Sequence, residues 1–238
     1  PYMLRWQDNG EEIRAYRKSR GQSRKLPGEE YYFKPGITYS YIGPSGFKAR
    51  LLSPGSIFDI ASSAIFSRDT SLEYLLGYLN SSLARYILGV LNPTVNFQIG
   101  DLRKLPYIVP SEKQDKQVCE LVKEAISISC YFEQYDFQSP SFKGTILEEF
   151  LSENNWEELD SKDSEVENAY RQVLEEVRES KKKEAELQKV IDRLIYDLYK
   201  IPASLIQEIE SDPWVNKDSF TQIEPPAMMA LLKQIRKS

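Results

Sequence analysis

A cluster of cationic side chains near the N-terminus is the part of the sequence best suited to contact another molecule. Residues 14–25 contain no acidic residue, and Gln22 lies among their cations, which are Arg14, Arg17, Lys18, Arg20, Arg24 and Lys25. Lys and Arg neutralise phosphates, while Arg and Gln can hydrogen-bond to the edges of guanine and adenine. We therefore predict a flexible basic loop that contacts a polyanion, and the alternative is a solvated surface loop.

The composition excludes most catalytic chemistry. The 238 residues include no histidine, which removes Ser-His and Cys-His nucleophile pairs, the commonest general base and most zinc sites. The sequence also contains no Gly-rich phosphate loop, no cysteine pair at metal-binding spacing and no nuclease-like carboxylate cluster. We predict no catalytic residue, metal site or cofactor site in this chain, and an independent hydrolase is the weakest interpretation.

The charge is distributed unevenly between the two halves. Residues 1–110 carry 14 Lys and Arg against 9 Asp and Glu, whereas residues 111–238 carry 17 against 27. Phosphate contacts require positive charge at the contact surface rather than a positive net charge of the whole chain. We therefore expect only the first half to face a polyanion.

The chain has the composition of a soluble, cytoplasmic globular protein. Its residues are 41% hydrophobic, which is enough for a core, and no apolar run approaches the ~20 residues that span a bilayer. Cys119 and Cys130 are expected to be reduced core residues about three turns apart on one helix. Because the sequence begins at Pro1 rather than Met, we expect a fragment of a longer protein.

Residues 31–66 are expected to form a meander of short strands. The expected strands are 37–42, 47–52 and 56–60, with turn-forming residues between them. Polar side chains on strand faces and turn tips are free of the core, so they are either solvated or further candidates for contact with the polyanion. These candidates are Lys34, Thr38, Ser40, Ser45, Lys48 and Arg50.

The residues that follow are predicted to form one helix and one short strand. Leucines and other apolar residues recur at three- and four-residue steps over 72–91, which predicts a helix. Val95, Phe97 and Ile99 then alternate with polar residues as in a half-buried strand, and Gly100-Asp101 is expected to end it in a turn.

The second half is predicted to be helical, which makes the fold α+β. Residues 145–201 contain neither Gly nor Pro, and a long spacer helix is expected over about 163–199. Its apolar positions follow the four–three repeat of a coiled-coil seam, interrupted only by Ser180 and Glu184. The seam positions are Val166, Tyr170, Val173, Val177, Ser180, Glu184, Leu187, Ile191, Leu194 and Leu198. We place the boundary between a β-rich domain, 1–110, and a helical region, 111–238.

Three ordered segments resemble a known family. Residues 92–102, Asn-Pro-Thr-Val-Asn-Phe-Gln-Ile-Gly-Asp-Leu, with Leu105-Pro106, resemble the end of the target recognition domain in BREX phage-resistance methyltransferases and fused type IIG restriction-modification enzymes. Residues 31–40 and 76–82 are similar to two earlier runs of that domain. The run Ile191–Ile201 extends the resemblance to about residue 205. A shorter stretch, from Leu105 into the helix expected after Ser111, is similar to type I specificity subunits.

The resemblance implies a DNA target recognition domain of an adenine-N6 DNA methyltransferase. The parent enzyme would use S-adenosylmethionine, and the partners would be double-stranded DNA and the methyltransferase domain of the same parent chain. Asn92-Pro93 resembles the start of the motif that holds a flipped adenine, but Thr94-Val95 departs from it, so no catalytic role is carried over.

A protein-interaction scaffold is the alternative function. In that interpretation the long helix dimerises or docks another subunit of the defence system, and DNA binding is incidental. Its support is the four–three repeat and the acidic second half.

Overall fold

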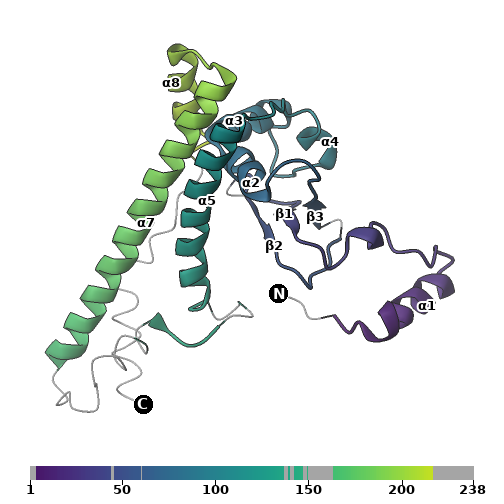
Figure 1. The fold of residues 1–238 in the computed structure, drawn as a ribbon. Coiled ribbons are helices and arrows are strands. Elements are labelled where there is room, and N and C mark those ends of the chain that lie inside the picture. The colour runs from purple at the N-terminus through teal and green to yellow at the C-terminus, as the bar shows by residue number, and fades with distance from the viewer. Residues whose placement is uncertain are drawn as a thin grey trace.

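The computed structural model describes residues 4–43, 46–59, 61–136, 139, 142–146, 149 and 163–216. A small antiparallel sheet, a short helix packed on it, a second short helix beside the first and a pair of long helices make up the fold, so the predicted α+β class is confirmed (Figure 1). No helix within these ranges is both long and apolar enough to cross a bilayer.

The sheet has three strands: β1 Gly36–Ser40, β2 Ala49–Leu52 and β3 Ser62–Ile65. β1 pairs with both of the others, so the order β2-β1-β3 replaces the predicted meander. β1 is buried along almost its whole length, and the central position covers both of its edges. The strand predicted at 56–60 is also wrong, because residues 56–59 are not in a strand and β3 begins only at Ser62.

Two helices replace the single helix predicted over 72–91. They are α2 Leu72–Asn80 and α3 Ser82–Leu91, and Ser81 between them is extended, with φ −63° and ψ 152°. The Ser81 hydroxyl donates to the Tyr78 carbonyl at 2.7 Å and accepts from the Ala84 amide at 3.2 Å. A serine in this geometry begins a helix more favourably than it continues one, which explains the break.

Asn80 ties the end of α2 to the edge strand β2. Its side-chain amide accepts from the Ala49 amide at 2.8 Å and donates to the Ala49 carbonyl at 2.9 Å. These two bonds satisfy backbone groups that an edge strand otherwise leaves unpaired. The sheet is thereby fixed against the helical part of the molecule.

The strand predicted at 95–99 is also wrong. Asn96 forms an isolated bridge with Ile42, and Phe97 is 3% exposed, whereas Ile99 is 50% exposed and begins the short helix α4 Ile99–Leu102. The Asn92 amide donates to the Asn96 carbonyl at 2.9 Å and to the Asp101 carboxylate at 2.8 Å. These side-chain bonds bend the segment into a compact turn that buries the Phe97 ring. The alternation of apolar and polar residues over 95–99 therefore did not indicate a strand.

The long helices are α5 Glu112–Glu133 and α7 Asp163–Tyr199, and α8 Ala203–Ser211 follows them. α5 begins with a capping box in which Ser111 and Gln114 exchange hydrogen bonds. The bounds of α7 confirm the long helix predicted at about 163–199. Figure 1 shows α5 and α7 side by side and antiparallel, with α8 beside α3 at one end.

The seam of α7 packs inward on α5 and the α2–α3 pair. The buried seam residues are Tyr170, Val173, Leu187 and Ile191, while the side chain of Val166 lies outside the described residues. Glu184, which interrupts the repeat, accepts a hydrogen bond from Ser129 of α5 at 3.0 Å. Beside it, Lys183 forms an ion pair with Glu124 of α5 at 2.7 Å. The polar interruption is therefore a polar contact between two helices of the same chain.

The two cysteines of α5 occupy different environments. Cys119 is buried, and burial raises the pKa of its thiol. Cys130 is exposed, so the prediction that both are core residues is wrong for Cys130. Both thiols are free.

One buried cluster crosses the predicted domain boundary, because it contains Ile37 of the sheet as well as Ile191 and Ile195 of α7. Asp192 lies at this junction and is 7% exposed. It accepts from the Ser82 amide at 2.8 Å and from the Ser82 hydroxyl at 2.7 Å, so a carboxylate of α7 caps the N-terminus of α3. The division at residue 110 stays a prediction.

Replacing Asp192 by Ala should destabilise the whole chain. Ser82 would lose both hydrogen bonds in a buried site, so we expect the free energy of unfolding to fall by about 2–3 kcal/mol. Urea denaturation followed by circular dichroism measures this change. Asp197→Ala, an exposed position on the same helix, is the matched control and should change little. Equal unfolding midpoints for the two variants would contradict the capping role.

Candidate nucleic-acid interface

The N-terminal residues form a separate module beside the sheet. It comprises η1 Gln7–Gly10, α1 Glu11–Ser19, a connecting loop and η2 Glu29–Tyr31. Figure 1 shows α1 standing away from the sheet and the long helices. Acidic residues occupy the first turn of α1 and basic residues the last, an order that favours the helix dipole.

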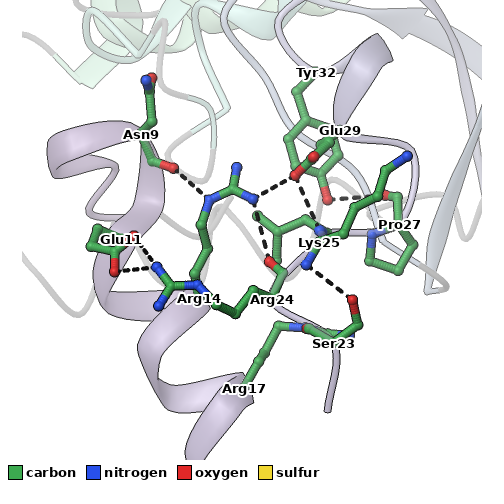
Figure 2. A network of polar contacts seen from close by, with 11 residues as sticks. Asn9, Glu11, Arg14, Arg17, Ser23, Arg24, Lys25, Pro27, Glu29 and Tyr32 are labelled. Atoms are coloured by element: carbon green, nitrogen blue, oxygen red, sulfur yellow. Dashed lines mark hydrogen bonds and ion pairs between the residues drawn. The ribbon is translucent and has the colours of Figure 1, made fainter.

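Arg14 joins three parts of this module, as Figure 2 shows. Its guanidinium contacts the Glu29 carboxylate at 2.7 Å, the Asn9 carbonyl at 3.2 Å and the Arg24 carbonyl at 3.3 Å. Glu29 also accepts from the Leu26 amide at 3.1 Å. The hydrogen bonds from Arg14 and Leu26 lower the pKa of the Glu29 carboxyl below its usual value. Arg14 thus holds η1, the loop and η2 together.

Arg24 and Arg17 fix the loop between α1 and η2. Arg24 donates to both oxygens of Glu11, one of them at 2.7 Å, and the Arg17 guanidinium donates to the Ser23 carbonyl at 3.0 Å. The predicted flexible loop over 14–25 is therefore wrong in two respects. Residues 14–19 belong to α1, and the loop that follows is held by side-chain bonds. The acidic partners of Arg14 and Arg24 are Glu29 and Glu11, which lie outside the stretch 14–25 on which the prediction was based.

The module carries further cations that are not bound to carboxylates. Lys18, Arg20 and Lys25 are exposed and form no ion pair with any residue that the structure describes. Arg20 lies over the Tyr16 ring, 5.6 Å from its centroid. Gln22 is exposed beside them. This arrangement leaves positive charge facing solvent on a framework that is itself held by ion pairs.

The candidates on the sheet have different environments. Thr38 is 4% exposed and its hydroxyl bonds to the Ser62 hydroxyl at 2.8 Å and the Ser63 carbonyl at 3.1 Å, so its predicted exposed position is wrong. The residue lies on the central strand, and its side chain is bonded to the neighbouring strand β3. Arg50 is exposed on the edge strand β2 and donates to Ser40 at 3.3 Å, and Lys48 is exposed just before β2. Ser45 lies outside the described residues.

Two open clefts lie beside the module, and both combine aromatic with charged residues. The first has a volume of about 690 Å³, and its lining residues are Glu30, Tyr31, Lys34, Pro35, Phe66, Ser67 and Arg68. The second measures about 610 Å³, and its lining residues are Trp6, Asn9, Arg14, Lys25, Glu29, Glu30, Tyr32 and Phe33. Of the predicted cations, Lys34 lies in the first cleft and Arg14 and Lys25 in the second. Arg68 was missed because it stands alone in the sequence, next to an acidic residue.

The described residues offer no site for a metal ion. No group of three or more His, Cys, Asp or Glu side chains within these ranges is arranged to bind one.

Comparison with known proteins relates the chain to part of a methyltransferase. Adenine-specific methyltransferase BrxX of Escherichia coli O9:H4 (strain HS) is 30% identical over 131 residues, 54% of this chain and 10% of the relative. Adenine-specific methyltransferase PglX of Lacticaseibacillus casei (strain Zhang) is 29% identical over 215 residues, 88% of this chain and 17% of the relative. The chain therefore spans only a small part of either relative. No protein-family profile matches it.

Removing the Glu29 carboxylate should loosen the module at neutral pH. Because the pKa of Glu29 is lowered in the folded chain, its ion pair contributes stability above the ordinary pKa of 4.5, and this contribution is lost as the pH falls through the folded pKa. Glu29→Gln should therefore accelerate amide exchange in residues 20–28 at pH 7, and the difference from the wild type should vanish under more acidic conditions.

Hydrogen exchange measured by mass spectrometry, corrected for the intrinsic effect of pH, tests this. Glu30→Gln is the matched control, since Glu30 is exposed and adjacent. A difference between Glu29→Gln and the wild type that is the same at every pH would show that the ion pair is not its cause.

Proposed function

We propose that this chain recognises duplex DNA for a site-specific adenine-N6 DNA methyltransferase of a phage-defence or restriction-modification system. The observation that carries the proposal is the N-terminal module, in which ion pairs hold the framework and leave Lys18, Arg20 and Lys25 exposed. The similarity to two adenine-specific methyltransferases supports the same function.

Phosphate contacts would position the chain on the duplex. Lys18, Arg20 and Lys25 of the module and Lys48 and Arg50 of the sheet supply exposed charge for this role. Base edges would be read by side chains that can form paired hydrogen bonds, and Gln22 is the exposed candidate for adenine. Arg14 and Arg24 act indirectly, because their guanidinium groups are bound to carboxylates and orient the loop.

The parent enzyme would take its methyl group from S-adenosylmethionine. The two clefts described above place cations, Lys34 and Arg68 in one and Arg14 and Lys25 in the other, where they would repel its sulfonium group. We therefore propose that cofactor binding and methyl transfer belong to the methyltransferase domain of the same parent chain. This chain would hold the DNA so that the target adenine faces that domain.

A scaffold function receives less support from the packing of α7. The seam that could dimerise is covered by α5 and the α2–α3 pair, with Ile191 and Leu187 buried within one chain. A dimer through this seam would have to displace those contacts. The α7 surface that remains exposed is mainly charged.

A salt titration tests the proposed function directly. Fluorescence anisotropy of the chain with labelled random duplex and single-stranded DNA should show preferential duplex binding that weakens steeply as salt rises. Loss of affinity by about tenfold or more between 50 and 200 mM salt would fit several phosphate contacts. Absence of duplex binding at low salt would refute the proposal, and a defined oligomer in light scattering would then favour the scaffold.

Reversing charge on the sheet should weaken duplex binding without unfolding the chain. Lys48→Glu with Arg50→Glu places two carboxylates where two cations would face phosphates, so we expect affinity to fall about tenfold or more at low salt. Thermal unfolding should change little, since both side chains are exposed. The matched control is Lys113→Glu with Lys116→Glu on α5. Unchanged affinity of the sheet variant in a gel-shift titration would refute this face as a contact surface.

A further inference from the structure

Six aromatic rings form a second cluster outside the main core. Trp6 packs on Tyr32 and Phe33, Tyr32 packs on Phe58, and Phe58 packs on Phe66, with centroid separations of 5.3–5.7 Å. Tyr31 completes the series by stacking on Phe66 at 4.7 Å, with 23° between the ring planes. None of these rings is fully buried. A continuous aromatic surface that retains access to solvent is unusual for a stretch that serves only as core.

The Tyr31 end of this cluster opens into the 690 Å³ cleft. The Lys34 ammonium lies 5.6 Å from the centroid of the Tyr31 ring, and Arg68 and Glu30 also line the cleft. Arg68 forms no ion pair with any described residue. An aromatic ring, two cations and one carboxylate are therefore presented together to solvent.

The backbone beside the cleft is adapted to hold the Phe66 ring. A Cβ atom at Gly36 would lie 2.8 Å from Phe66 Cε1 and 2.9 Å from the Ile65 carbonyl oxygen, closer than such contacts occur. Gly36 begins β1, so the absence of a side chain at this position lets the Phe66 ring lie against the strand. The Tyr31–Phe66 stack is thus built on the sheet rather than on a mobile loop.

We infer that this cleft binds one unstacked nucleotide of a DNA strand whose base carries an exocyclic amine. Phe66 covers one face of the Tyr31 ring, so a base would stack on the other face, and the Lys34 ammonium would move from over the ring to a flanking phosphate. Arg68 offers a second positive charge, and Glu30 can accept from an amino group such as N6 of adenine or N4 of cytosine. A base inside an intact duplex has both ring faces covered by its neighbours, so stacking on Tyr31 requires a base that has left the helix.

The inference rests on the proposed function, since it assigns a nucleotide site within the same DNA-binding chain. The site is distinct from the cations of the module, which would contact the backbone of any duplex. The cations would bind any duplex, and the nucleotide site would make the chain prefer a duplex that contains an unstacked base.

Binding to bulged DNA tests the site. Labelled duplexes of one length, fully paired, with one unpaired adenine or with one unpaired thymine, are titrated with the full chain and followed by anisotropy. One stacked base contributes enough that the wild type should bind the adenine bulge about tenfold more tightly than the paired duplex, with a smaller gain for thymine. Tyr31→Ala should abolish the preference and Tyr31→Phe should retain it.

Charge variants separate the roles of the lining residues. Lys34→Ala and Arg68→Ala should each reduce affinity for the bulged duplex several-fold more than Lys116→Ala on α5, and Glu30→Ala should reduce the discrimination between adenine and thymine bulges. Melting temperatures equal to that of the wild type would show that these exposed replacements leave the fold intact.

The possible failures are distinguishable. Equal affinity for paired and bulged duplexes, with salt-dependent binding retained, would overturn the nucleotide site and leave the proposed function standing. Displacement of the bulged duplex by an equal concentration of free dAMP would also overturn it, because the site would then serve a mononucleotide. No binding to any duplex at low salt would overturn both.

Discussion

The buried carboxylate of Asp192 is the interaction on which the arrangement of the chain depends. It receives two hydrogen bonds from Ser82 and one from Gln188 at 3.1 Å, and so joins the C-terminal part of α7 to the start of α3. Burial raises the pKa of this carboxyl and the Ser82 bonds oppose that shift. A carboxylate held this way fixes the register of α7 on the α2–α3 pair, because sliding by one turn would leave it buried without donors.

Close packing between α2 and α5, together with side-chain bonds from α2, fixes the sheet relative to the long helices. A Cβ atom at Gly77 of α2 would lie 2.8 Å from Val122 and 3.0 Å from Val118, so glycine lets α2 approach α5 closely. At its end, α2 holds β2 through Asn80. Tyr199 of α7 donates to the Pro106 carbonyl at 2.7 Å and fixes the connection between the two halves. The sheet is therefore supported by the long helices, which stabilise a sheet that with only three strands would have little stability of its own.

The sequence predicted elements governed by local signals and missed those governed by distant partners. The bounds of α7 and the cap at Ser111 follow from periodicity and capping chemistry, and both were predictable. The central position of β1 and the burial of Thr38 depend on β3, whose pairing has no local signal. The sequence showed which cationic residues gather near the N-terminus, but not which of them form ion pairs. Glu11 and Glu29, which bind two of its arginines, lie outside the window that was read as basic.

The organisation of the N-terminal module changes how salt should act on it. Its cations divide into those bound to carboxylates, such as Arg14 and Arg24, and those exposed to solvent, such as Lys18 and Lys25. Salt screens both the exposed cations from phosphate and the exposed Arg24–Glu11 pair that holds the loop. Affinity for a polyanion would then fall with salt more steeply than the number of phosphate contacts alone requires, because the loop loses order at the same time. The aromatic cluster opposes that loss, since stacking of Tyr31 on Phe66 is insensitive to ionic strength and anchors the module to the sheet.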